Sequence, residues 1–254
     1  MLAQQRHDRI ARTLRAEGPA AVSTLAERLG VSQATVRRDL LELERQGRLT
    51  RVYGGAVSSA EHDEPFADVA TVRVPEKDAI AARAAALVED GETVLLDIGT
   101  TAHRLARRLH GRAITVVTSS LAVYDELRDD EAIELIVLGG MVRRSYRSLV
   151  GFLTEDALRQ IHADRVFLGT SGVRPDGGVL DTTSIEVPVK RAMIAAADQV
   201  VLLADATKFP GRGLARVCGP EQLDVVVTDA PGNAPVLAAL GEAGVEIQRA
   251  GRAG

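Results

Sequence analysis

The chain has 254 residues, of which 46% are hydrophobic and 26% charged, and this composition excludes a disordered or collagen-like protein. No apolar run reaches 18 residues and none follows Met1, so we expect neither a transmembrane helix nor a secretory signal, and the single Cys218 fits a reducing cytoplasm. The net charge of −4 is unevenly divided: residues 1–57 carry ten arginines and six acids (+4) and the rest carries −8, which indicates either a basic nucleic-acid module or a solvated arginine-rich surface.

The N-terminal segment shows helical periodicity. An amphipathic helix is expected over residues 3–16, because apolar residues recur on one face and a basic stripe lies at every third position. The stripe consists of Arg6, Arg9, Arg12 and Arg15. Residues 20–22 predict a very short strand. Ser23 is then expected to cap a second helix, which ends at Gly30.

A third helix follows directly. Ser32 is expected to cap it, it ends near Gln46, and it buries Val36, Leu40 and Leu43 at helical spacing. Two helices joined by a tight glycine turn form the helix-turn-helix pattern. In that motif the N-terminal residues of the second helix of the pair reach base edges in the major groove.

Polar side chains of the third helix lie largely off its buried stripe. Glutamine can pair with adenine, arginine with guanine, and a threonine methyl can touch a thymine methyl, while two adjacent arginines also suit a phosphate clamp. Residues 48–57 alternate around Gly54-Gly55 like a hairpin, which indicates a wing or a plain turn. The residues assigned to the DNA interface are Ser32, Gln33, Thr35, Arg37, Arg38, Arg51 and Tyr53.

The rest of the chain predicts an acidic linker and then an α/β body. Residues 58–73 contain acids and little periodicity, with room for one short extended piece. A helix over residues 76–89 is followed by six apolar strands with helices between several of them, and this order predicts a parallel sheet covered on both faces. The expected strands are 93–97, 114–118, 133–138, 165–168, 200–204 and 225–228, and two of the helices are 101–109 and 120–128.

Small polar residues follow several of these strands, where ligands bind in parallel sheets. Gly99 before Thr100 and Thr101 offers backbone N–H groups, hydroxyls and a helix dipole to a phosphate, and Lys208 offers a point charge. A single turn of this kind is more often only a helix cap. Several such turns at the ends of different strands together favour a small, anionic, polyhydroxylated ligand. The other turns are 118–120, 139–140, 169–172 and 205–208.

These motifs resemble the DeoR family of bacterial transcriptional regulators. The front part carries the run VSQATVRRDL at 31–40 and the string YGGA at 53–56. The body carries Asp97 before Gly99, and Glu186 four residues before Lys190. The resemblance implies a small winged helix-turn-helix domain (1–57), a linker (58–73) and an α/β sensor domain with a mainly parallel sheet (74–254), similar in fold to ribose-5-phosphate isomerase and glucosamine-6-phosphate deaminase.

The resemblance also implies a function. It implies a cytoplasmic, homo-oligomeric repressor that binds operator DNA, is released by a phosphorylated sugar, and holds neither cofactor nor metal. Phosphate would lie on the 99–101 turn and Lys208, and the sugar on the deeper polar residues. The implied effector-binding residues are Asp97, Gly99, Thr100, Thr101, Ser119, Ser120, Gly139, Gly140, Thr170, Glu186, Lys190 and Lys208. Ser119-Ser120 departs from the asparagine often found there, which bears on hydroxyl recognition.

A sugar-phosphate isomerase or deaminase is the alternative function. Such catalysis needs a carboxylate base. In the isomerases that the chain resembles, a glutamate immediately precedes the lysine, but here Val189 precedes Lys190, and the turn at 169–172 has no carboxylate. Glu186 could be a displaced base, although binding a sugar hydroxyl or capping the helix is simpler. We therefore expect no enzyme activity.

The remaining reactive residues indicate no further chemistry. The five histidines lack metal-ligand spacing, and Cys218 is expected to be a small buried residue. Residues 143–147 form a basic loop whose simplest expectation is solvated surface, with a subunit contact or a lid over the ligand as alternatives.

Overall fold

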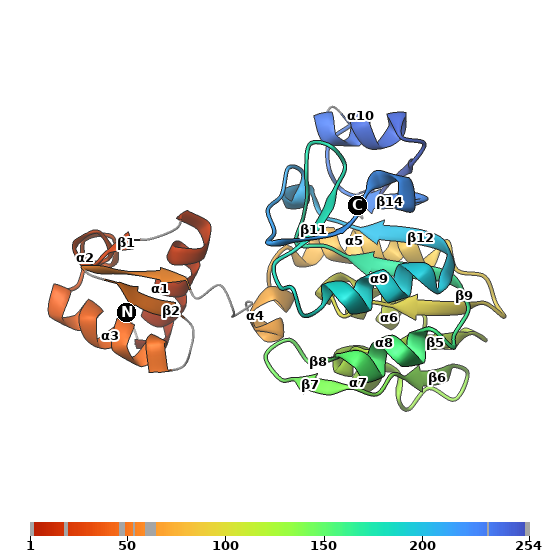
Figure 1. Cartoon of the computed structure of the whole chain (residues 1–254), viewed down its shortest axis with the longest axis horizontal. Helices are drawn as coiled ribbons and strands as arrows, with labels where there is room; N and C mark the ends of the chain where they lie inside the picture. The colour runs from red at the N-terminus through yellow and green to blue at the C-terminus, as the bar shows by residue number, and fades with distance from the viewer. Residues whose placement is uncertain are drawn as a thin grey trace. The chain divides into compact units, whose positions relative to one another are not determined.

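The computed structural model describes residues 3–17, 20–45, 49–52, 54–58, 65–232 and 234–251. The chain divides into two compact units, residues 1–63 and 64–254 (Figure 1). No helix in the described ranges is both long and apolar enough to cross a membrane.

The N-terminal unit is a three-helix bundle with a small antiparallel sheet. Its elements are α1 (Ala3–Glu17), β1 (Ala20–Ala21), α2 (Val22–Leu29), α3 (Gln33–Arg45), β2 (Leu49–Val52) and β3 (Gly55–Ser58), and the strand order is β1-β3-β2. One apolar cluster joins the helices to the sheet, because Ile10, Leu25 and Leu40 are all buried in it. The unit therefore has a hydrophobic core of its own.

Two of the helix-end residues predicted in this unit are confirmed, and one is wrong. Gly30 ends α2 in the left-handed conformation (φ 65°), and the Ser32 hydroxyl accepts from the Thr35 amide at 3.1 Å, as expected. The predicted cap at Ser23 is wrong, because α2 already begins at Val22. The Val22 amide donates to the Gly54 carbonyl at 3.0 Å and its side chain is buried, so the pairing of β1 with the wing fixes where this helix starts.

The second unit alternates helices and strands. Its elements along the chain are α4 (Phe66–Ala70), α5 (Val74–Ala85), β4 (Thr93–Leu96), α6 (Thr100–Arg108), β5 (Thr115–Thr118), α7 (Leu121–Leu127), β6 (Glu134–Val137), β7 (Met141–Arg143), β8 (Ser148–Val150), α8 (Phe152–Leu158), β9 (Ala163–Gly169), β10 (Gly172–Val173), β11 (Val179–Asp181), α9 (Val187–Ala195), β12 (Ala197–Leu203), the 3₁₀ turn η1 (Ala206–Lys208), β13 (Ala215–Cys218), the 3₁₀ turn η2 (Pro220–Gln222), β14 (Val225–Thr228), α10 (Pro235–Glu242) and β15 (Glu246–Arg249). All six predicted strands are confirmed, but the expectation that 133–138 is buried is wrong, because β6 is the edge strand and its Ile136 and Val137 are exposed. Helix α4 lies inside the segment expected as a linker, because Phe66 is buried there.

The main sheet has seven parallel strands in the order β15-β14-β12-β9-β4-β5-β6. The chain starts this sheet at β4, adds β5 and β6 on one side, and then crosses to β9 on the other. The reversal makes the gap between the carboxyl ends of β4 and β9 a topological switch point, where open α/β sheets bind ligands. Two antiparallel sheets, β7-β8 and β10-β11-β13, complete the unit.

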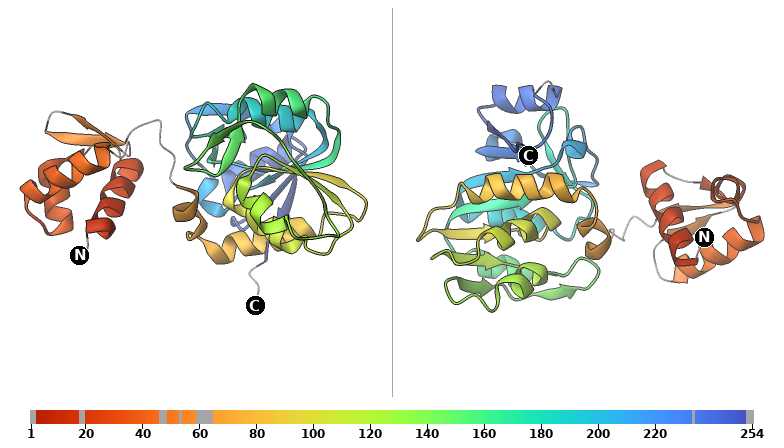
Figure 2. Two further views of the ribbon diagram at one scale, coloured as in Figure 1. Left: turned by 90° about the horizontal axis from the view of Figure 1, so that it is seen from below. Right: turned by 180° about the vertical axis from the view of Figure 1, so that it is seen from behind.

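Helices cover both faces of the sheet, as the continuous apolar strands predict. On one face the side chains of α5, α6 and α7 pack with Val94 and Leu96, and on the other those of α8, α9 and α10 pack with Leu95. Figure 2 shows α5 and α6 on the side opposite to α8 and α9. Cys218 lies in the second cluster and is buried, as expected, and burial raises the pKa of its thiol to about 12.

Candidate nucleic-acid interface and ligand site

Helix α3 separates a buried stripe from a polar face. Val36, Leu40 and Leu43 are buried in the core, as the spacing predicts. Gln33, Arg37 and Arg38 are exposed; the Arg37 guanidinium donates to the Gln33 amide oxygen at 3.4 Å. In the described part of the chain neither arginine forms an ion pair, so two positive charges on this face are available to an anionic partner.

A buried ion pair fixes the orientation of α3. The Asp39 carboxylate accepts from Arg6 Nη2 at 2.8 Å and from His7 Nε2 at 2.9 Å, which ties α3 to α1. Burial alone would raise the pKa of Asp39, but the hydrogen bonds from Arg6 and His7 lower it below its ordinary value. Arg6 is therefore not part of an exposed basic stripe, as its spacing suggested. It points inward because the carboxylate lies there.

The wing explains both glycines of the hairpin. Gly54 has a left-handed backbone (φ 78°), and a Cβ on Gly55 would lie 2.3 Å from the Ala20 carbonyl oxygen, where β1 approaches β3. Arg51 is exposed and donates through Nε to Glu44 of α3 at 2.6 Å, so its remaining guanidinium N–H groups stay available. Tyr53, the other residue predicted in the wing, lies outside the described residues.

In the second unit, two predicted effector residues, Asp97 and Lys190, meet at the switch point. Asp97 directly follows β4, and its carboxylate accepts from the Gly169 amide at the end of β9 at 2.9 Å. The Lys190 ammonium forms a buried ion pair with Asp97 and donates to the Gly169 carbonyl at 3.1 Å. The sheet order thus brings together side chains that are 93 positions apart in the chain.

Two further carboxylates surround this lysine. Asp181, at the end of β11, lies 3.5 Å from Lys190 Nζ, and Glu186 caps α9 one turn before it. Burial alone would lower the pKa of Lys190, but Asp97, Asp181 and Glu186 together raise it, so the lysine stays charged. Burial raises the pKa of Glu186 to about 7. The cluster is therefore a buried polar centre of three carboxylates around one lysine.

Glu186 also links this centre to the hairpin β7-β8. The Ser148 hydroxyl donates to Glu186 Oε1 at 3.0 Å, and Arg143 forms an ion pair with the same oxygen. The side chain of Arg143 is only 13% exposed. The expectation that residues 143–147 form a solvated loop is therefore wrong for Arg143, because Glu186 draws its guanidinium inward; Arg147 forms an ion pair with Asp125 of α7.

The predicted phosphate turn keeps donors free. Gly99 caps α6, so the first amides of this helix have no helical partner. Thr101 is half-buried beside them. The Ser119 hydroxyl, after the neighbouring strand β5, is fully buried and has no hydrogen-bond partner among the described residues. Lys208 is half-buried in η1 and makes no ion pair there. An orphaned buried hydroxyl indicates a missing polar partner.

Four other predicted residues have structural contacts. The Ser120 hydroxyl accepts from the Val123 amide at 3.2 Å and so caps α7, and the Thr170 hydroxyl lies 2.9 Å from the Leu180 carbonyl and closes the turn after β9. The Gly139 carbonyl accepts from Thr154, and a Cβ on Gly140 would lie 2.9 Å from a backbone oxygen of β8. These side chains and backbones shape the site rather than face it.

The sequence interpretation missed Asp181 and Ser148, and it gave Arg143 only as part of a basic loop, with a lid over the ligand as one alternative. Asp181 ends a short apolar run, 179–180, and a carboxylate at the end of a strand was the available signal. Arg143 and Ser148 lie opposite each other in β7-β8, and nothing in their local sequence predicts that they share a glutamate 38 or more positions away. Across the described ranges no group of three or more histidines, cysteines or acids is arranged to hold a metal ion.

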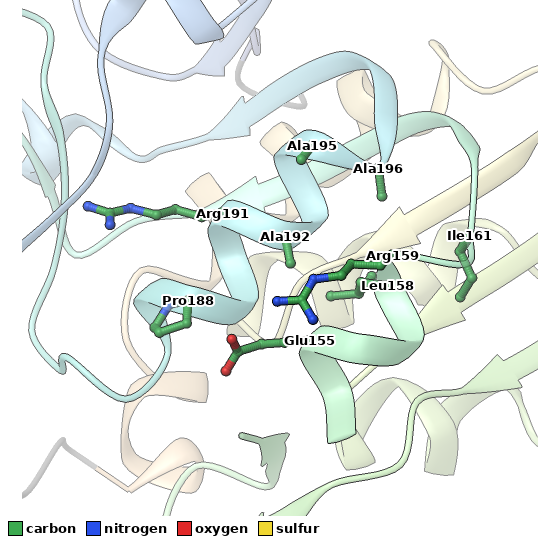
Figure 3. A pocket seen from close by; sticks show the side chains of 9 residues that line it. All are labelled: Glu155, Leu158, Arg159, Ile161, Pro188, Arg191, Ala192, Ala195 and Ala196. Carbon is green, nitrogen blue, oxygen red and sulfur yellow. The ribbon is translucent and has the colours of Figure 1, made fainter. Parts of the chain in front are cut away.

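A groove between α8 and α9 lies outside this centre. Figure 3 shows its lining residues: Glu155, Leu158, Arg159, Ile161, Pro188, Arg191, Ala192, Ala195 and Ala196. None of them is a predicted effector residue. The guanidinium of Arg191 already donates to the Val217 carbonyl at 3.0 Å, and Arg159 pairs with Asp156. The groove therefore offers no buried polar group to a ligand.

Comparison with known families gives matches to both parts of the chain. The DeoR-like helix-turn-helix domain matches residues 6–62, and the DeoR C terminal sensor domain matches residues 72–230.

Similar whole-length relatives carry regulator names. The transcriptional repressor AccR of Agrobacterium fabrum is 37% identical over 89% of each chain. The glycerol-3-phosphate regulon repressor of Escherichia coli is 32% identical over 96% of this chain and 98% of its own. The HTH-type transcriptional repressor GlcR of Bacillus subtilis is 33% identical over 86% of this chain and 85% of its own. Among solved structures, ribose 5-phosphate isomerase A of Methanocaldococcus jannaschii is similar over 52% of each chain, with 18% identity and a TM-score of 0.39.

Proposed function

Because the chain belongs to the DeoR family of transcriptional regulators, we propose that it represses carbohydrate-metabolism genes from an operator and that a phosphorylated sugar releases it. The observation that carries the proposal is the exposed face of α3, where Arg37 and Arg38 form no ion pair with any residue that the structure describes. The names of the relatives, among them a glycerol-3-phosphate regulon repressor, support the class of regulated genes.

On the DNA side, residues 1–57 form the reader and 58–73 the connection to the sensor at 74–254. The N-terminal half of α3 enters the major groove, and the wing contacts the backbone. Arg37 and Arg38 bind phosphate or guanine, because both side chains are exposed at the start of the helix. The residues given this role are Ser32, Gln33, Thr35, Arg37, Arg38, Arg51 and Tyr53.

On the effector side, the switch point holds a phosphorylated sugar. The free amides at Gly99–Thr101 and the charge of Lys208 bind the phosphate. Asp97, Glu186 and Lys190 face the sugar hydroxyls, and Ser119 supplies the buried hydroxyl that lacks a partner. Ser120, Gly139, Gly140 and Thr170 hold the walls in place through the contacts described above.

The proposed function also bears on the oligomeric state, the location and the cofactor requirement of the protein. A winged module has a small footprint on DNA, so we expect a homo-oligomer on paired half-sites. Such a regulator acts where the DNA lies, in the cytoplasm. The proposal includes no cofactor and no metal.

A sugar-phosphate isomerase is the second candidate, because buried Glu186 has a pKa of about 7 beside a lysine, as a general base requires. Its contacts with Arg143 and Ser148 favour a binding role instead. Proton NMR of the protein with ribose 5-phosphate or fructose 6-phosphate separates the two. Turnover that Glu186→Gln abolishes would establish the enzyme, whereas no turnover supports the regulator.

A gel-shift titration tests the regulator directly. The full chain is mixed with the DNA upstream of its own gene and with glycerol 3-phosphate, ribose 5-phosphate, fructose 6-phosphate or glucosamine 6-phosphate, each beside its unphosphorylated form. One phosphorylated compound should release the DNA. Thr101→Val and Lys208→Ala should remove the response and keep DNA affinity, while Thr115→Val, at the amino end of β5, should respond normally. Release that these two substitutions leave unchanged would contradict the assigned site.

A further inference from the structure

We propose that the sensor hairpin, residues 141–150 of β7, β8 and their turn, transmits the state of the effector site to helix α4. The inference rests on the proposed function and names the regulation of the same site. Helix α4 is the first helix after the DNA-binding unit in the chain, and β3 of that unit ends at Ser58, eight positions before Phe66. A displacement of Phe66 therefore acts on the DNA-binding unit through a short covalent connection.

One end of the sensor hairpin is built into the effector site. Arg143 and Ser148 are register partners on its two strands, and both contact Oε1 of Glu186. Both strands of the hairpin are thus held by a single carboxylate. A sugar whose hydroxyls bind Glu186, with its phosphate on the 99–101 turn as proposed above, competes with Arg143 and Ser148 for this carboxylate and so weakens the contacts that hold the hairpin.

The other end of the sensor hairpin holds Phe66. The Phe66 amide donates to the Ser145 carbonyl at 2.9 Å, and its buried ring meets the Tyr146 ring edge-on at 5.9 Å. The Arg147 guanidinium lies 5.9 Å from the same ring. Three consecutive residues of the turn therefore contact the first residue of α4.

Tyr146 connects the two ends. The Arg143 guanidinium lies over its ring at 5.4 Å, while the ring contacts Phe66. When sugar hydroxyls take the place of Arg143 on the Glu186 carboxylate, the guanidinium leaves both Glu186 and the face of Tyr146. The ring then loses a cation that fixes its position, and the support of Phe66 changes with it.

The C-terminal end of α4 is held by neighbouring helices, so its N-terminal end is the end that can move. Lys77 donates to the Val69 carbonyl at 2.7 Å and Arg104 donates to the Ala70 carbonyl at 3.1 Å, which ties the C-terminal end to α5 and α6. The N-terminal end depends on the sensor hairpin and on an edge contact between Phe66 and His103. A shift of the hairpin pivots α4 about its C-terminal end.

The coupling follows thermodynamically from differential affinity. A sugar phosphate releases DNA only if it binds more tightly to the hairpin arrangement that disfavours operator binding. Coupling between two sites changes affinity by about 5- to 150-fold. Removing the Tyr146 ring should leave both binding sites intact and reduce this factor toward one.

The first test measures operator Kd of the full chain by fluorescence anisotropy, with and without each of the four sugar phosphates above. Tyr146→Ala should keep the operator Kd of the free protein within about twofold and lose most of the response. Tyr146→Phe keeps the ring and should respond like the natural chain, as should Arg144→Ala, an exposed neighbour in the same turn. An undiminished response in Tyr146→Ala, or an equal loss in Arg144→Ala, would overturn the inference.

The second test needs no sugar. Glu186→Gln weakens the site end of the sensor hairpin, and hydrogen exchange at the Phe66 amide should then accelerate by about tenfold, while the same change in a Tyr146→Ala background should add little. Unchanged exchange at Phe66 would overturn the inference even if a sugar phosphate releases DNA. Accelerated exchange without release by any of the four compounds would support the inference and contradict the proposed effector class.

Discussion

Asp39→Ala should loosen helix α3, the proposed DNA-contacting helix, from the rest of its unit. The side chain of Asp39 is 7% exposed and that of Arg6 is 12% exposed, so truncation leaves a nearly buried guanidinium without its carboxylate. Removing one partner of a buried pair costs about 3–5 kcal/mol, and the residual exposure of Arg6 places this pair near 3 kcal/mol. Local opening of α3 should therefore become roughly 150-fold more frequent.

Hydrogen exchange of the full chain measures this directly at the amides of residues 33–45. Glu42→Gln is the matched control, because Glu42 lies on the exposed side of the same helix, and its effect should stay within about 0.5 kcal/mol. The lowered pKa of Asp39 means that its contribution is present above its ordinary pKa of 3.8 and is lost as pH falls through the folded value. Equal exchange in the two variants would refute the structural role of the pair.

Three further predictions concern the interface and the site. Arg38→Ala should weaken operator binding by about 1–3 kcal/mol, whereas Arg45→Ala in the last turn of α3 should not; equal losses measured by anisotropy would remove Arg38 from the groove. Gly55→Ala should weaken operator binding by disturbing the wing, since its Cβ would lie 2.3 Å from the Ala20 carbonyl oxygen, and unchanged affinity would contradict a wing contact. Burial raises the pKa of Glu186 from 4.5 to about 7, so the folded state keeps this proton to a higher pH than the unfolded state does. The free energy of unfolding should therefore fall by about 3 kcal/mol as pH rises from 4.5 through 7. Urea unfolding of Glu186→Gln should lose this pH dependence, and an equal dependence would assign the titration to another group.

The body of the fold could be predicted because its strands are continuous apolar runs. Runs such as 114–118 and 225–228 can only be buried on both faces, and the structure places them in the parallel sheet. Strand β15 was not predicted, because its sequence, Glu-Ile-Gln-Arg, contains one apolar residue among three polar ones and lies at the edge of the sheet. Helix α4 was not predicted because its five residues are too few for helical periodicity, and the burial of Phe66 depends on tertiary contacts.

In the candidate interface and ligand site, too, features set by local spacing could be predicted, whereas contacts between distant residues could not. The exposed face of α3 follows from local spacing, since Val36, Leu40 and Leu43 fix which side is buried. The contact of Asp39 with Arg6 does not, because 33 positions separate them and only the packing of two helices joins them.

Tertiary packing also decides the roles of the ligand-site residues. Asp97 and Lys190 could be named from family motifs, but their ion pair depends on the crossing from β6 to β9. The Thr170 hydroxyl lies within hydrogen-bond distance of two backbone carbonyls, Gly172 and Leu180, and the second of these contacts depends on tertiary packing that the local sequence does not show.

Reciprocal calorimetry tests most directly whether one chain couples DNA and sugar binding. The affinity of the releasing sugar phosphate is measured on the free protein and on the protein saturated with operator DNA. Thermodynamic linkage requires that DNA weaken sugar binding by the same factor by which the sugar weakens DNA binding, and the account predicts this equality. A sugar affinity that saturating operator DNA leaves unchanged would contradict it.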